Sequence, residues 1–239
     1  MTQHYLEGRN ESELLWFQRR SFLQAAAAWT AVGSMGAAHA QARGNVVELR
    51  GDATVNGQTL LPNQTVQTGD EIVTGPRSTL IFVVGNSAFH VRQNSSMMVE
   101  RGPTINAVSL LRLLTGAVVS VWGKGSSRQI TTPTLTAGIR GTGVYTEVFS
   151  KQGGRTYFCN CYGVVDLVSG ADRKTSESSY HDAVWSEPMR DGRASLTHAR
   201  AINHTDAELE FLARLIGART AWQISGIKGN KDMEREYGG

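Results

Sequence analysis

The chain has 239 residues, of which 40% are hydrophobic and 19% are charged, a composition typical of a globular protein and not of a disordered one. Its formal net charge at pH 7 is only +3, and its arginines are scattered along the sequence without forming a run. Because nucleic-acid binding needs a concentrated basic surface, we predict that nucleic acid is not a partner.

The first 40 residues have the pattern of an export signal. The pair Arg19-Arg20 is followed by Ser-Phe-Leu, which is the arrangement of a twin-arginine signal. An Ala-rich stretch, residues 25–38, leads to Ala38-His39-Ala40, a small-x-small pattern suited to signal peptidase. The stretch contains neither Leu nor Ile, so it is a poor permanent membrane span. We therefore predict cleavage before Gln41 and a periplasmic mature protein, which touches the membrane only if the signal is retained.

The sequence from Val46 to Ser169 consists of short β-type segments separated by turn residues. Residues 79–84 form an apolar run rich in β-branched side chains, and Gly85-Asn86 joins it to residues 87–92 as in a tight hairpin. Further strand candidates, each bounded by turn residues, are 117–122, 143–149, 155–162 and 164–168. Short strands at this spacing predict an all-β fold, either a β-sandwich or a β-solenoid.

One α-helix is predicted in the C-terminal part, over residues 206–216. Thr205 and Glu208 have the spacing of a capping box, and leucines then repeat at helical intervals until Gly217. We expect its apolar side to pack on the sheet, with docking to a partner as the alternative. The polar residues 228–239 are predicted to form a loose tail.

Several motifs along the strands resemble one known family. They are Leu-Pro-Asn-Gln-Thr-Val-Gln-Thr-Gly-Asp followed by Ile-Val-Thr-Gly in residues 61–75, Thr-Gly-Ala-Val-Val in 115–119, Thr-Pro-Thr in 132–134, and Ala-Gly-Ile-Arg-Gly-Thr in 137–142. The last of these is the most specific. Together they resemble the FecR-like family of periplasmic domains.

The resemblance implies an all-β periplasmic domain that binds or signals and does not catalyse. The best-known members act in iron–siderophore signalling, where a cytoplasmic anti-sigma segment precedes a membrane span. Only 18 residues precede the arginine pair here, so we expect no anti-sigma segment. The expected organisation is a signal peptide (1–40), a FecR-like domain (44–170) and a C-terminal extension (171–239). The expected partner is an envelope protein or a small ligand.

The two cysteines, Cys159 and Cys161, are two positions apart on a predicted strand, so their side chains should face the same side. Two thiolates and neutral imidazoles can together bind one soft metal ion such as zinc or copper. We predict Cys159, Cys161 and His181 as ligands, with His204 or His198 as the fourth. This metal- or redox-active centre is the alternative to a simple binding module.

Other interpretations of these residues remain open. An oxidising compartment favours disulfides, although partners two apart on a strand lie near the limit of disulfide reach. Buried cysteine is also a common small hydrophobic residue. If His181 binds a metal ion, Asp182 is the candidate acceptor that would orient its ring.

No catalytic signature is recognised in the sequence. It contains neither a G-x-S-x-G nor an H-E-x-x-H motif. The glycines around Arg140 do not match a phosphate-binding loop. They favour a tight turn in which Arg140 is a structural donor or a contact for an anionic ligand. We therefore predict a non-enzymatic protein.

Overall fold

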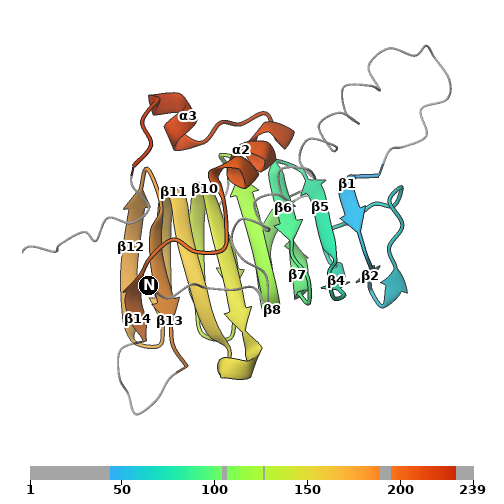
Figure 1. Ribbon diagram of the computed structural model, residues 1–239, viewed down its shortest axis with the longest axis horizontal. Coiled ribbons are helices and arrows are strands. Elements are labelled where there is room, and N and C mark those ends of the chain that lie inside the picture. Colours follow the sequence, from blue (N-terminus) through green and yellow to red (C-terminus); the bar gives the residue numbers. More distant parts are fainter. Residues whose placement is uncertain (1–43, 104–106, 126, 189–194, 230–239) are drawn as a thin grey trace, which may run out of the picture.

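The computed structural model describes residues 44–103, 107–125, 127–188 and 195–229. The predicted export signal, residues 1–40, and residues 230–239 of the predicted tail lie outside this described part. The described part is mostly β-sheet with helices near its C-terminal end (Figure 1), which confirms the all-β prediction. Within the described ranges, no helix is long and apolar enough to cross a membrane.

The strands before residue 102 are short, whereas three later strands have 14 or 15 residues each. The short ones are β1 (Val46–Arg50), β2 (Ala53–Val55), β3 (Gln58–Thr59), β4 (Glu71–Thr74), β5 (Thr79–Val84), β6 (Ser87–Val91) and β7 (Ser96–Arg101). The long ones are β8 (Val108–Trp122), β10 (Thr136–Phe149) and β11 (Arg155–Ser169). The other elements are β9 (Arg128–Thr131), the 3-10 helix η1 (Ser150–Gln152), β12 (Asp172–Ser178), β13 (Asp182–Ser186), β14 (Leu196–Ala199), α2 (Asp206–Leu215) and α3 (Ala221–Ser225).

The long strands bend at glycines. In β8, Gly116 has φ 77°, and a side chain there would overlap Ser95. Before this glycine β8 pairs with β7, and after it β8 pairs with β6. The same occurs in β11, where Gly163 has φ 100°. The structure therefore has one strand with a bend at Gly163, where the sequence predicted two separate strands over 155–162 and 164–168.

The bends divide one continuous hydrogen-bonded sheet into two halves that share a core. One half contains β1, β5, β6, β13 and β14; the other contains β2, β3, β4, β7, β9 and β12; the long strands run through both. Leu80 on β5 and Ile72 on β4 belong to different halves, yet both side chains are fully buried in the same apolar cluster. The two halves thus enclose the core as the layers of a sandwich do.

The outer face of the first half is also apolar, and the helices cover it. Ile81 points away from its neighbour Leu80 into a second cluster, as strand alternation requires. From the strands this cluster includes Ala88, Val119, Val121, Tyr145, Tyr157, Cys159 and Cys161, and from the helices Leu209, Phe211, Leu212 and Trp222. The prediction that the helix packs on the sheet is therefore confirmed, with α2 lying against β8 and β6.

Most local predictions from the sequence agree with the structure. The tight turn expected around Arg140 is wrong, because these residues belong to β10, which has a bulge between Arg140 and Gly143. β5 and β6 form the expected hairpin, with Gly85 at φ 58° between the paired residues Val84 and Ser87. Thr205 and Glu208 form the expected capping box of α2. Two features were not predicted. A second short helix, α3, has its own capping box, and β12 to β14 carry the sheet beyond residue 170.

A buried ion pair fixes α2 to the sheet. Glu208 is fully buried, and its Oε1 lies 2.6 Å from Arg92 Nη2 and 3.1 Å from His90 Nδ1, both on or next to β6. The other oxygen, Oε2, accepts a hydrogen bond of 2.9 Å from the Thr205 backbone N–H. Burial alone would raise the pKa of Glu208, but Arg92, His90 and the Thr205 N–H outweigh it and lower the pKa to about 2.

We predict that Glu208→Gln destabilises the protein by about 3 kcal/mol at neutral pH, because removing one partner of a buried ion pair leaves the charge of Arg92 buried and uncompensated. A depressed pKa stabilises the fold above pH 4.5, and this contribution is lost as the pH falls toward 2. Urea unfolding of the wild type and of Glu208→Gln should therefore show a difference in the free energy of unfolding that becomes smaller as the pH falls toward 2.

The matched control for this prediction is Glu100→Gln. Glu100 pairs with Arg112 at 2.9 Å, but the two side chains are 36% and 50% exposed. An exposed pair contributes about 1 kcal/mol or less. The role given to Glu208 would be contradicted if both substitutions lowered the free energy of unfolding equally. It would also be contradicted if the loss in Glu208→Gln did not change with pH.

Candidate metal centre

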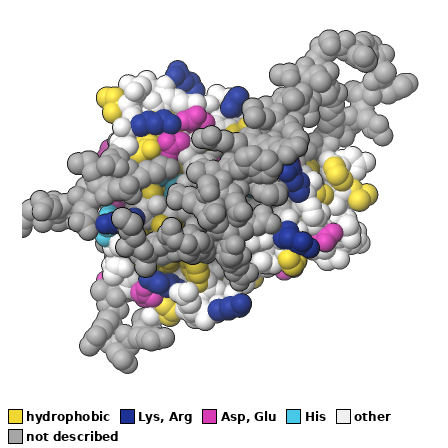
Figure 2. Space-filling model, in the orientation of Figure 1, with side chains coloured by type: hydrophobic (Ala, Val, Ile, Leu, Met, Phe, Trp, Pro, Cys, Tyr) yellow, Lys and Arg dark blue, Asp and Glu magenta, His cyan; other side chains and the backbone are white. Residues whose placement is uncertain are grey.

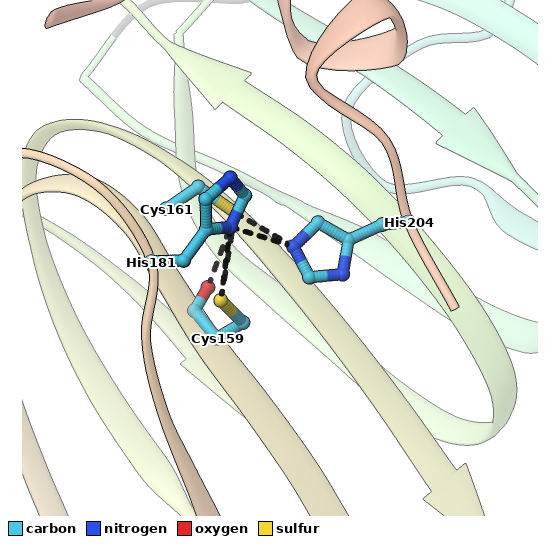
Figure 3. A group of neighbouring side chains, drawn as sticks. All are labelled: Cys159, Cys161, His181 and His204. Atoms are coloured by element: carbon cyan, nitrogen blue, oxygen red, sulfur yellow. Dashed lines mark hydrogen bonds between the residues drawn. The ribbon is translucent and has the colours of Figure 1, made fainter. Parts of the chain in front are cut away.

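Four of the predicted ligands lie together between the sheet and the segment that leads into α2. Figure 3 shows the side chains of Cys159, Cys161, His181 and His204 pointing toward one another. Their sulfur and nitrogen ligand atoms all lie within 4.8 Å of one another. The fold therefore joins residues that are up to 45 positions apart in the sequence, since 204 − 159 = 45.

The two thiols project from the first half of β11. Cys159 lies between Tyr145 of β10 and Ala183 of β13, so its backbone is held on both sides. Both cysteines face the helix-covered side, and both are 0% exposed. The alternation of a strand thus places the two sulfurs 3.8 Å apart, on one face and out of solvent.

A tight turn brings His181 over the sulfurs. The turn follows β12, and His181 has φ 45°, a left-handed conformation that few non-glycine residues adopt. Its backbone N–H donates to the Cys161 carbonyl at 2.9 Å, which holds the turn against β11. The side chain of His181 is 0% exposed.

The loop before α2 brings His204 to the same place. Asn203 has φ 59°, and its amide donates to Glu147 Oε2 at 2.8 Å. The hydroxyl of Tyr157 fastens the loop further by donating to the Arg200 carbonyl at 2.8 Å. The His204 ring then stacks on Tyr145, with 4.9 Å between ring centroids.

Hydrogen bonds fix which nitrogen of each ring faces the centre. His204 Nδ1 lies 2.6 Å from the Ile202 carbonyl, which only accepts, so Nδ1 carries the proton. His181 Nε2 lies 3.1 Å from Asp206 Oδ1, so Nε2 carries the proton there. In the neutral rings, His181 Nδ1 and His204 Nε2 are therefore both acceptors, and they face each other at 3.0 Å.

Four of the six distances between the ligand atoms can be compared with the edges of a tetrahedron around one ion. Zinc bonds of about 2.3 Å to sulfur and about 2.0–2.1 Å to nitrogen imply edges of about 3.8 Å (S–S), about 3.5 Å (S–N) and about 3.3 Å (N–N). The S–S separation is 3.8 Å, two of the four S–N separations are 3.5 Å (Cys159–His181) and 3.3 Å (Cys161–His204), and the N–N separation is 3.0 Å. The other two S–N separations are at most 4.8 Å.

The surroundings favour the thiolate form, which is the form that binds metals. Burial alone would raise the pKa of the Cys159 thiol, but its contacts with Cys161, His204 and His181 lower the pKa well below its usual range. The donor set of two sulfurs and two imidazoles is therefore chemically suited to a soft divalent ion.

Two sequence-based expectations about neighbouring residues need correction. Asp206, and not Asp182, accepts the hydrogen bond from His181; Asp182 instead contacts Ser176 and Lys174. His198, the alternative fourth ligand, is exposed on β14 and lies outside the group. Sequence reasoning also missed Trp222, whose ring stacks on His181 with 5.6 Å between centroids.

The exposed arginine in the glycine-rich motif has a partner on the neighbouring strand. Arg140 is 67% exposed and pairs with Asp166 at 2.7 Å. Asp166 also accepts a hydrogen bond from Thr175 at 2.7 Å. The Lys and Arg side chains that are visible in Figure 2 are dispersed.

The cysteines are free thiols with 3.8 Å between their sulfurs. We predict that a thiol reagent applied to the protein as purified reacts slowly in the folded state, because both side chains are buried, and finds both thiols after denaturation. The measurement is absorbance after addition of an aromatic disulfide, with and without guanidinium. Absence of reactive thiols in the denatured, unreduced protein would instead establish a disulfide.

Comparisons with known proteins assign no family to the chain. No family model matches it, and no curated protein matches it. Two crystal structures, each of a "putative anti-sigma factor" from Parabacteroides distasonis ATCC 8503, are similar to part of the chain. Both have a TM-score of 0.45, at 7% and 9% sequence identity. They overlap 54% and 56% of this chain, and the chain spans 58% and 60% of their lengths.

Proposed function

We propose that this protein is a non-catalytic binding and signalling module that holds one zinc ion between Cys159, Cys161, His181 and His204. The observation that carries this proposal is the convergence of two sulfur and two nitrogen donor atoms within 4.8 Å of one another. All four positions of the ion would be occupied by protein atoms. A closed site of this kind is structural, because catalytic zinc keeps one position for water or substrate.

The donor set favours zinc over the other soft ions. Tetrahedral sites with two sulfur and two nitrogen donors are typical of zinc, whereas copper(II) prefers square-planar or tetragonal arrangements. An iron–sulfur cluster needs room for more than one metal ion, and the four donor atoms here lie within 4.8 Å of one another. Copper(I) also accepts thiolate ligands and is therefore the competing ion in the test.

The signalling and export parts of the proposal are supported by the sequence motifs. The FecR-like pattern of residues 61–75 and 137–142 agrees with an all-β body. A twin-arginine signal agrees with a protein whose centre assembles before export, since this route typically carries folded proteins. Within this proposal the module acts in the periplasm on an envelope protein or a small ligand.

We predict about one zinc per chain in protein purified without chelators, because thiolate and imidazole donors of this geometry bind zinc tightly. Elemental analysis after growth with zinc and copper available measures both metals. Cys159→Ser combined with Cys161→Ser should abolish binding. His198→Asn is the matched control and should leave the metal content unchanged, since His198 lies outside the group. Copper in excess of zinc, or no bound metal after reconstitution, would contradict the zinc proposal.

We predict that Asp206→Asn weakens zinc binding about 10–100-fold, as is typical when the hydrogen-bond acceptor of a ligating histidine is removed. Competition against a chromophoric chelator measures the affinity. Asp182→Asn is the control, because Asp182 lies next to His181 in sequence but contacts Ser176 and Lys174. If the zinc affinity falls more in Asp182→Asn than in Asp206→Asn, then Asp206 is not the residue that orients the His181 ring.

A further inference from the structure

We infer that the bound metal ion controls whether the C-terminal segment, defined as residues 200–229, stays docked on the outer face of the sheet. This inference rests on the proposed metal site and adds a consequence to it. The ion would act as a removable cross-link between this segment and the β body. Loss of the ion would release the segment and uncover the apolar surface beneath it.

The ligands are divided unequally between the two parts. Cys159 and Cys161 belong to β11, and His181 sits in the turn between β12 and β13, so three ligands belong to the β body. The fourth, His204, belongs to the C-terminal segment. Asp206, which orients His181, is the first residue of α2. The metal centre therefore ties the start of α2 to the sheet at a single point.

The same point is where a bound ion would join the loop to the body. His204 Nε2 lies 3.0 Å from His181 Nδ1 and 3.3 Å from Cys161 Sγ, so one ion among these atoms would bind both parts at once. Loss of the ion would remove the metal–ligand bond between His204 and the body. His204 could then move away from the body together with its loop.

The docked segment covers a surface that water would otherwise reach. Leu209 and Leu212 of α2 are fully buried against the outer face of the sheet, and so is most of Trp222 in α3. Trp222 also packs edge-on against Tyr180 and Tyr162, with 5.4 Å and 5.5 Å between ring centroids. Undocking would expose these apolar side chains together with Arg92, the partner of Glu208. Because this apolar surface would be exposed only after the ion is lost, its exposure would let metal loss act as a signal.

The test compares zinc-loaded and chelator-treated full-length protein by limited trypsin digestion. The C-terminal segment offers cleavage sites at Arg214 and Arg219, and Arg140 on the exposed face of the sheet is the internal reference. We predict that removal of zinc speeds cleavage after Arg214 and Arg219 at least about tenfold, because cleavage follows the population of the opened state. Cleavage after Arg140 should not change.

Hydrogen exchange on the same two samples separates local release from global unfolding. Amides of α2 and α3 should lose protection when zinc is removed, while those of β5 and β6 keep it. His204→Asn should resemble the zinc-free protein even with zinc present, and His198→Asn should resemble wild type. If His204→Asn does not fold, the comparison of loaded and stripped wild-type protein still decides the question.

The outcomes distinguish this inference from the proposal on which it rests. Zinc binding without any change in protection of α2 and α3 would overturn the inference and leave the metal site standing. Equal loss of protection in β5 and β6 would also overturn it, since the ion would then support the whole fold. Failure to bind zinc at all would remove both.

Discussion

Two thiol sulfurs and two imidazole nitrogens face one another in a buried space, and this donor set suits a soft cation. The lowered pKa of the Cys159 thiol favours its thiolate form, and the outer nitrogens of the two rings hydrogen-bond to Asp206 and the Ile202 carbonyl. Buried groups of this kind are costly unless paired. Much of the structure around them serves to hold this arrangement: the alternation of β11, the left-handed turn at His181 and the loop that ends at His204.

A second buried interaction supports the same contact between helix and sheet. Glu208 closes the capping box of α2 and also pairs with Arg92, so the helix start is fixed from inside the interface. Tyr145 connects the two sites physically, because its ring stacks on His204 while the guanidinium of Arg92 lies 5.6 Å from the ring centre. The metal centre and the ion pair are thus neighbours in one polar network within an otherwise apolar face.

Local sequence patterns predicted the local structure well. Thr205 with Glu208, and Gly85 between two apolar runs, act over a few residues, so their meaning does not depend on the rest of the fold. The pairing of Cys159 with Cys161 on one face follows from strand alternation alone. Gly163 was harder to interpret, because a glycine with positive φ can either end a strand or bend it, and only pairing with β12 and β13 decides which.

The longer-range contacts of the site could not be predicted from the sequence in the same way. Asp182 is adjacent to His181, yet strand geometry turns it toward Ser176, while Asp206 arrives through the docking of α2. His198 and His204 were equivalent as candidates by sequence distance. Their difference arises because β14 exposes His198, whereas Asn203 turns the chain inward at the next residue.

The most direct measurement is X-ray absorption at the metal edge of the purified protein. A single ion held by the four residues predicts two sulfur neighbours at about 2.3 Å and two nitrogen neighbours at about 2.0–2.1 Å. A shell of six oxygen or nitrogen atoms, or a spectrum without sulfur neighbours, would contradict the assignment of Cys159, Cys161, His181 and His204 as the metal ligands.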